Sequence, residues 1–232
     1  IKCGRCIDVC KNIQGINILE NMGRSHDMQI TPAYGKYLSD ESCTFCGQCA
    51  SVCPVAAITE KDDTDVVWNA LHDESKHVIV QIAPAVRVSL GEELGYPAGE
   101  IVTGKMVATL RMLGFNKVFD TDFTADLTII EEGHELIDRI TNNGILPMMT
   151  SCCPGWISYV EQHHPELIPH LSTCKSPQQM FGTLAKTYYA DKENIPINDL
   201  VVVSIMPCTA KKYEAKRKEM SFDGIHPDVD HV

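Results

Sequence analysis

The chain has 232 residues, of which 44% are hydrophobic, and its formal net charge is −11 at pH 7. This length and apolar content suffice for one large globular domain or two smaller ones. The negative charge argues against a protein that binds nucleic acid or anionic membranes, because both are negatively charged themselves. No apolar run approaches the roughly 20 residues of a membrane-spanning helix. We therefore expect a cytoplasmic protein, although residue 1 is not a methionine and no targeting signal is readable.

Eleven cysteines are the most informative part of the composition, and seven of them lie in residues 3–53. A disulfide framework suits small secreted domains, whereas these seven have the tight spacings of metal ligands. Residues 43–54 read C-x2-C-x2-C-x3-C-P, a run that is typical of bacterial-type iron–sulfur proteins. Zinc sites rarely use four cysteines in this spacing. We therefore predict four ligands of iron–sulfur clusters, namely Cys43, Cys46, Cys49 and Cys53.

An incomplete second run, C-x2-C-x3-C, precedes the first and consists of Cys3, Cys6 and Cys10. In two-cluster ferredoxins the fourth cysteine of each run binds the other cluster. This rule predicts one complete [4Fe–4S] site formed by Cys10 with Cys43, Cys46 and Cys49. It also predicts three ligands of a second site, which are Cys3, Cys6 and Cys53. We interpret residues 1–62 as a ferredoxin-like α+β domain whose first cysteine is missing before residue 1; a natural [3Fe–4S] or open site is the alternative.

The remaining elements follow from hydrophobic patterning. Residues 22–28 are predicted to form a loop, and the acidic stretch 62–65 marks a domain boundary. Apolar runs rich in Val and Ile then predict buried strands at 77–83, 117–121, 145–149 and 200–206. Helices are predicted at 103–113, 125–142, 154–164, 178–191 and 210–220. This alternation predicts that residues 63–232 form an α/β domain, with a parallel sheet of about four strands between helices.

The carboxyl ends of three predicted strands carry functional residues. Ala83 and Pro84 follow the first strand, Cys152 and Cys153 follow the third, and Cys208 follows the fourth. Open parallel sheets bind their ligands at this edge. We therefore expect the sheet to bring Cys153 and Cys208 together as metal ligands, although either thiol alone would more often be a buried structural residue. The adjacent thiol of Cys152 would remain free to carry protons.

Two segments resemble active-site signatures of the [FeFe]-hydrogenases: TSCCPGW at 150–156 and MPCTAKK at 206–212. The twin cysteine runs are similar to the electron-relay ferredoxin domain of that family, so the resemblance covers essentially the whole chain. It implies reversible conversion of protons and electrons to H2, with a ferredoxin or similar carrier as electron partner. It also implies an H-cluster, a [4Fe–4S] cube bridged by a cysteine to a diiron unit with CO, cyanide and dithiolate ligands.

The same resemblance implies roles for individual residues. Cys153 and Cys208 would be two of the four cube ligands, and Cys152 would exchange protons with the dithiolate amine. A cyanide ligand would bond to Lys211, in a pocket that is also lined by Met206, Ala83 and Pro84. The proton path of the family passes through a glutamate, a serine and a second glutamate, which in this chain are Glu132, Ser172 and Glu135.

Patterning gives these path residues unequal support. Glu132 shares a helical register with three apolar residues, so we expect a partly buried carboxyl with a raised pKa; the three are Ile129, Leu136 and Ile140. Glu135 fits the same side of the helix or an exposed position, and Ser172 would more usually cap a helix. In the last helix Glu214 is at pairing distance from Lys218.

The third signature of the family, with two more cube cysteines, does not occur in the sequence. We therefore expect an internal fragment of a longer enzyme, which assembles at most one complete [4Fe–4S] cluster and does not turn over hydrogen alone. A non-catalytic iron–sulfur assembly protein and a hydrogen sensor are the alternatives. Both kinds of relative usually lack the proton-donating thiol, so Cys152 favours the hydrogenase.

Overall fold

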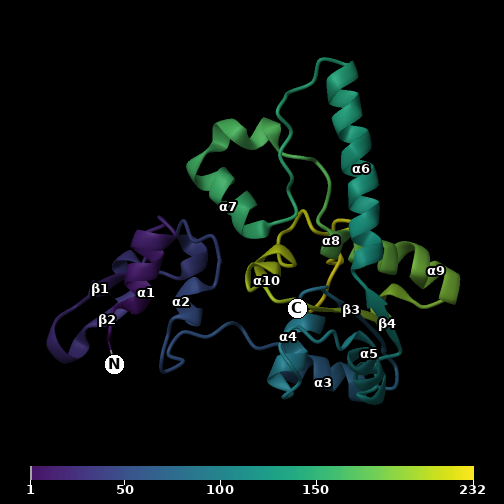
Figure 1. Cartoon of the computed structure of the whole chain (residues 1–232), viewed down its shortest axis with the longest axis horizontal. Helices are drawn as coiled ribbons and strands as arrows, with labels where there is room; N and C mark the ends of the chain where they lie inside the picture. Colours follow the sequence, from purple (N-terminus) through teal and green to yellow (C-terminus); the bar gives the residue numbers. More distant parts are fainter. Residues whose placement is uncertain (1) are drawn as a thin grey trace. The chain divides into compact units, whose positions relative to one another are not determined.

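The computed structural model describes residues 2–232, which form two compact units (Figure 1). The first unit contains the chain up to Lys61 together with Cys153–Pro169 and Cys208–Ala210. The second unit contains Asp62–Cys152, His170–Pro207 and Lys211–Val232. The peptide bond between the two adjacent thiols, Cys152 and Cys153, is therefore also a boundary between the units.

Short elements make up the first unit. Its main elements are α1 (Arg5–Asp8), a π-helix (Val9–Ile13), β1 (Glu20–Met22), β2 (Gln29–Thr31), α2 (Gln48–Ser51) and α7 (Pro154–His163). β1 and β2 pair as an antiparallel hairpin, and a 3-10 helix (Ser25–Asp27) lies in its connection. The predicted loop at 22–28 is confirmed except at Met22, which ends β1; the two strands on either side of it were not predicted. Three-residue strands are too short for alternation to show in the sequence.

The two cysteine runs share one local backbone conformation, around Cys3 and around Cys46. Gly4 and Gly47 follow Cys3 and Cys46, with φ of 79° and 74°, and each is the N-cap of a four-residue helix. The residues before these cysteines, Lys2 and Phe45, also have positive φ, at 52° and 55°. Left-handed backbone is rare outside glycine. Its occurrence at matching positions shows that the twin runs are a structural duplication.

A parallel sheet organises the second unit. Its strand order is β4-β3-β5, with β3 (His77–Ile82) in the centre between β4 (Lys117–Asp120) and β5 (Leu200–Ile205). Alternate residues of β3 enter two buried clusters: Ile79 packs with Phe181 and Val202, and Val78 and Val80 pack with Met106 and Leu110. Side chains of successive strand residues point to opposite faces. The predicted α/β architecture, a parallel sheet covered on both faces, is confirmed, with three strands instead of about four.

The segment 145–149, predicted as a strand, is not part of this sheet. Its only ladder contact among the described residues is a single bridge from Met149 to Leu171. Ile145 and Leu146 are exposed, and Pro147 has no N–H to donate. The adjacent thiols therefore do not follow a sheet strand, although α7 begins at Pro154 as predicted.

The helices of the second unit agree with most predictions. They are α3 (Thr64–His72), α4 (Val86–Glu93), α5 (Thr103–Met112), α6 (Asp122–Thr141), α8 (Pro177–Leu184), α9 (Ala190–Glu193) and α10 (Ala210–Glu214). The sequence did not indicate α3 and α4. The helix predicted at 178–191 contains a π-helical turn (Ala185–Tyr189), and the one predicted at 210–220 ends at Glu214. None of the helices within 2–232 has the length and apolarity needed to cross a membrane.

Candidate functional site

Four thiols of the first unit lie close enough to interact electrostatically. Burial raises the pKa of the Cys43 thiol to about 11, the N–H of Phe45 opposes this shift, and the neighbouring thiols of Cys49, Cys46 and Cys10 raise it further. The N–H of Phe45 donates to Cys43 Sγ at 3.4 Å. The structure therefore brings together the four residues of the complete [4Fe–4S] site predicted by the crossed-ligation rule.

A second sulfur environment surrounds Cys53. Backbone N–H groups of Val55, Ile58 and Ala57 lower the pKa of its thiol, and the donor of Ala57 lies 3.2 Å from Sγ. Such N–H donors stabilise a thiolate and suit a cluster ligand. The other two residues predicted for this site differ in exposure, because Cys3 is exposed and Cys6 is buried.

The donor atoms of the cysteine runs are all thiol sulfurs, the ligands of iron–sulfur clusters. All eleven cysteines are free thiols. Within residues 2–232, no three His, Cys, Asp or Glu side chains converge as one ion would require. A [4Fe–4S] cube binds each thiolate through a different iron atom, so its ligands stand further apart than those of a single ion. The donor chemistry of the cysteine runs thus fits iron–sulfur clusters.

Cys153 and Cys208 both belong to the first unit, next to the loop that carries Cys43. Cys153 is the N-cap residue of α7, and Ser158 on this helix donates to the carbonyl oxygen of Cys43 at 3.3 Å. Thr209, directly after Cys208, donates to the carbonyl oxygen of Phe45 at 2.9 Å. The segments that carry the two predicted cube ligands are therefore both hydrogen-bonded to the loop of the complete cluster site.

Lys211, in the second unit, is held in a buried polar cluster. Its Nζ donates to the carbonyl oxygen of Cys152 at 2.8 Å and lies 3.0 Å from Glu214 Oε2. The same carboxylate oxygen accepts three further side-chain hydrogen bonds, from Ser176, Gln178 and Gln179. A buried carboxylate requires this many partners to offset its desolvation.

The sequence did not indicate the inward position of Glu214 or its amide partners. The predicted pairing of Glu214 with Lys218 is wrong, because α10 ends at Glu214 and this carboxylate turns inward to Lys211. The spacing of three residues between Lys211 and Glu214 was a readable signal, since residues at i and i+3 share a helix face. Gln178 and Gln179 gave no comparable signal, because only the tertiary fold brings them to the carboxylate.

Two of the three predicted proton-path residues are in direct contact. Ser172 Oγ donates to Glu135 Oε2 at 3.1 Å, and the N–H of Thr173 donates to the same oxygen at 3.0 Å. Arg139 donates to Glu135 Oε1 at 2.6 Å. Burial alone would raise the pKa of Glu135, but the hydrogen bonds from Thr173, Arg139 and Ser172 outweigh it, and the pKa is lowered. Arg139 also donates to the carbonyl oxygen of Leu171, a role that the sequence did not suggest.

Glu132, one helical turn before Glu135, is half-buried. Its Oε1 is buried and has no hydrogen-bond partner within the described residues. The structure confirms the expected partly buried carboxyl, although the three apolar residues in register with it are exposed; they are Ile129, Leu136 and Ile140.

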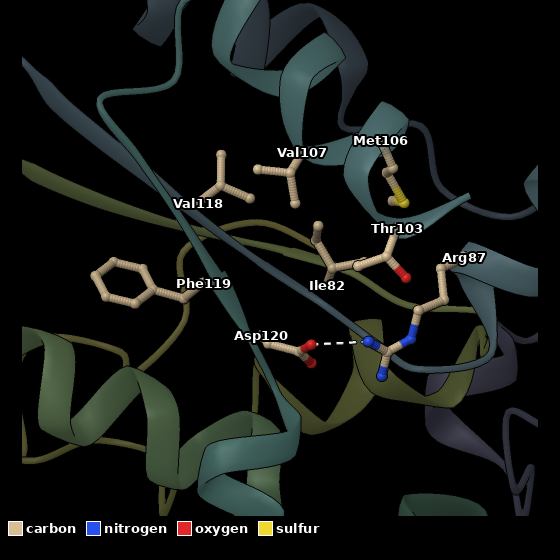
Figure 2. A pocket seen from close by; sticks show the side chains of 8 residues that line it. All are labelled: Ile82, Arg87, Thr103, Met106, Val107, Val118, Phe119 and Asp120. Atoms are coloured by element: carbon tan, nitrogen blue, oxygen red, sulfur yellow. Dashed lines mark hydrogen bonds and ion pairs between the residues drawn. The ribbon is translucent and has the colours of Figure 1, made fainter. Parts of the chain in front are cut away.

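The segment after β3 contains the remaining predicted pocket residues. Ala83 is buried, Pro84 is exposed and Met206, after β5, is half-buried. Arg87 of α4 fixes this turn, since it donates to the carbonyl oxygen of Pro84 at 3.2 Å and to Asp120 at 2.8 Å. Figure 2 shows this ion pair at a small cavity of about 130 Å³, whose other lining is mostly aliphatic. Because its charged groups pair with each other, this cavity offers no reactive side chain.

Comparisons with known proteins agree with the cysteine runs and the sheet. Residues 76–232 match the model of the iron only hydrogenase large subunit, C-terminal domain, and residues 1–57 match a 4Fe-4S dicluster domain. The chain is 52% identical to the NADP-reducing hydrogenase subunit HndD of Solidesulfovibrio fructosivorans, over all of this chain and 40% of that protein. It is 46% identical to iron hydrogenase 1 of Clostridium pasteurianum, over 99% of this chain and 40% of that protein.

Solved structures show the same relationship. An apo [FeFe]-hydrogenase from Chlamydomonas reinhardtii superimposes with a TM-score of 0.70 and 46% identity, over 74% of this chain and 45% of that one. A protein named cytosolic iron-sulfur assembly component 3, from Bos taurus, is also similar, at 31% identity over 84% of this chain. The chain spans about 40% of the length of the Solidesulfovibrio and Clostridium hydrogenases. Because the family model matches well over half of its residues, the chain belongs to the iron-only hydrogenase large-subunit family.

Proposed function

We propose that the protein that carries this chain is an [FeFe]-hydrogenase, which interconverts H2 with protons and electrons. The observation that carries the proposal is the hydrogen bonding of the Cys153 and Cys208 segments to the Cys43 loop. The arrangement joins an electron-carrying cluster site to two candidate ligands of a second metal centre. A plain electron carrier would need residues 2–61 and would leave the α/β unit without a role.

Electrons would reach the centre through the clusters of the first unit, supplied by a ferredoxin or similar carrier. Cys10, Cys43, Cys46 and Cys49 would hold the cluster that donates to it, and Cys3, Cys6 and Cys53 would contribute to a second one. The hydrogen bonds of Ser158 and Thr209 connect the segments that carry Cys153 and Cys208 directly to this loop. Direct backbone and side-chain hydrogen bonds of this kind fix cluster ligands in place.

Cys153 and Cys208 would bind the cube of an H-cluster, and this cofactor would supply the redox-active iron at which H2 is formed or split. Lys211 would bond an anionic ligand of the cofactor in the pocket to which Met206, Ala83 and Pro84 would also contribute. The network around Glu214 supports this role, because it fixes the position of the ammonium group before any ligand arrives. Preorganised charge of this kind loses little free energy to reorganisation.

Protons would move through Cys152, whose exposed thiol is not needed as a cube ligand if Cys153 takes that role. The hydrogen bond from Ser172 to Glu135 supports a relay at the other end of the path. Glu132, with a buried carboxyl oxygen that lacks a partner among the described residues, is suited to pass a proton, because it can accept a new hydrogen bond without breaking one.

An iron–sulfur assembly protein is the second candidate, because assembly factors are among the similar proteins. Such a protein would use the cluster ligands but would need no proton-donating thiol. Cys152, directly beside Cys153, favours hydrogen turnover over this alternative.

Hydrogen evolution from the purified, cofactor-loaded protein distinguishes the two functions. With a reduced viologen as electron source under anaerobic conditions, we expect H2 to form, at a rate that follows the iron content of each preparation. Iron loading without any H2 production would contradict the hydrogenase proposal and support the assembly function.

A further inference from the structure

The central strand β3 contains one fully buried polar side chain, that of Gln81. It follows Ile79 on the face of the strand that packs against Phe181 of α8. A buried amide without hydrogen-bond partners costs about 1–3 kcal/mol, so a glutamine at this position needs partners inside the core. None of the roles described so far uses this residue.

The amide of Gln81 has a partner at both of its ends. Its Nε2 donates to Ser204 Oγ of β5 at 2.6 Å and to the carbonyl oxygen of Gln178, in the first turn of α8, at 3.1 Å. Its Oε1 accepts a hydrogen bond from Thr121 Oγ1, directly after β4, at 3.0 Å. All three partner residues are at most 6% exposed. The amide therefore joins the sheet to the start of α8 in a region that water does not reach.

The first turn of α8 in turn holds Lys211. Gln178 Nε2 donates to the carbonyl oxygen of Lys211 at 3.3 Å and to Glu214 Oε2 at 3.1 Å. Gln179 Nε2 donates to the same carboxylate oxygen at 3.3 Å. The ammonium group of Lys211 donates to both oxygens of this carboxylate, at 3.1 and 3.0 Å. A displacement of the first turn of α8 would therefore move both the backbone and the counter-ion of Lys211.

The other contacts of this turn do not fix it to the sheet in the same way. Ser176, the N-cap of α8, donates to Glu214 and so belongs to the group that has to be held. Phe181 packs against the sheet one turn later, but apolar contact has no preferred direction. A hydrogen bond sets both distance and direction. The bond from Gln81 is therefore the contact that orients the start of α8.

We propose that Gln81 is a positioning residue for Lys211. It holds the first turn of α8 on the sheet and acts through Gln178 and Glu214. The ammonium group is thereby kept at the place where an anionic ligand of the cofactor would bond. This consequence for the cofactor rests on the proposed function, whereas the positioning itself does not.

The experiment is competitive labelling of lysines with acetic anhydride, in the chain purified under anaerobic conditions and read by mass spectrometry. The amine of Lys211 reacts only after it leaves its carboxylate, so the rate reports how firmly it is held. In Gln81→Met, which keeps the volume but has no amide, we expect Lys211 to react at least about threefold faster, because local opening becomes easier. Lys186, buried and paired with Asp230 at 2.8 Å, should react at an unchanged rate.

Ser204→Ala is the matched control. It removes one hydrogen bond from the same amide nitrogen but leaves the bond to Gln178, so the labelling rate of Lys211 should equal that of the wild type. Far-UV circular dichroism of each variant shows whether the fold is retained. Gln81→Leu, with an apolar side chain of similar size, replaces Gln81→Met if that variant does not fold.

Three results would overturn the proposal. The first is an unchanged rate at Lys211 in a folded Gln81 variant. The second is a rise that also occurs at Lys186 or that Ser204→Ala reproduces, because the whole core would then be loosened. The third is a failure of both Gln81 variants to fold, since the amide would then serve the sheet as a whole. Hydrogen turnover does not enter the measurement, so a failure of the proposed function would leave this result unaffected.

Discussion

Glu135 shows how one carboxyl can be fixed by neighbours that are distant in the sequence. Arg139 is one turn away on α6, but Ser172 and Thr173 come from a segment more than 35 residues later. Patterning placed Glu135 correctly on the helix but could not decide between burial and exposure. The decisive contacts depend on where the chain returns, which periodicity does not encode.

The lowered pKa of Glu135 predicts an acid-dependent loss of stability. Because its pKa lies below the ordinary value of 4.5, the folded state gains stability at higher pH and loses it as pH falls through the lowered pKa. Glu135→Gln removes this contribution, so its unfolding free energy should vary less with pH between about 5 and 3 than that of the wild type. Urea unfolding at a series of pH values measures the difference. Glu131→Gln, exposed on the same helix, is the control and should retain the wild-type profile.

Substitution of Gly47 is expected to lower the free energy of unfolding. Both Gly47→Ala and Gly4→Ala place a side chain at positive φ, which costs about 1 kcal/mol. Only at Gly47 would the new Cβ collide with Thr209, whose hydroxyl is hydrogen-bonded to Phe45. We expect Gly47→Ala to lower the unfolding free energy by about 1–3 kcal/mol more than Gly4→Ala. Equal losses in denaturant titrations of the two variants would show that Thr209 does not press on this glycine.

At the scale of elements, three of the four apolar runs that were predicted as strands are strands of the sheet, and the fourth is not. The runs at 77–83, 117–121 and 200–206 correspond to β3, β4 and β5, and in β3 and β5 Val and Ile fill both faces of a covered sheet. The run at 145–149 is also apolar but is exposed at Ile145 and Leu146. Composition alone cannot distinguish a buried strand from an exposed apolar segment.

The contact between α8 and the segment 226–231 predicts a stability effect. Asp228 is fully buried and accepts hydrogen bonds from Lys175 at 2.6 Å and Thr183 at 3.0 Å. Asp228→Ala leaves Lys175 without its carboxylate, and we expect a loss of about 2–3 kcal/mol in unfolding free energy, reduced by the partial exposure of the lysine. Glu219→Ala removes an exposed carboxylate that lies 3.6 Å from the half-buried Arg217, and it should cost under about 0.5 kcal/mol. Similar losses for both variants in thermal or urea unfolding would contradict this account.

At the scale of the whole molecule, the sequence predicted which two kinds of unit the chain forms, but not which segments of the chain belong to each unit. The spacing of the cysteines and the alternation of strands and helices indicated a cluster-binding part and an α/β part. It did not indicate that Cys153–Pro169 and Cys208–Ala210 pack with the cysteine runs. That arrangement depends on contacts such as Thr209 with Phe45, 164 residues apart, and no local pattern records them.

The division of labour between the two adjacent thiols is the central claim about function. If Cys153 binds metal and Cys152 moves protons, serine substitutions at the two positions should have different effects. The measurement is iron content together with viologen-driven H2 evolution, in the cofactor-loaded protein that carries this chain. For Cys152→Ser we expect wild-type iron content and turnover at least about 100-fold lower, because serine is a poor proton donor. For Cys153→Ser we expect iron itself to be lost. Turnover of Cys152→Ser near the wild-type rate, at equal iron content, would contradict the account.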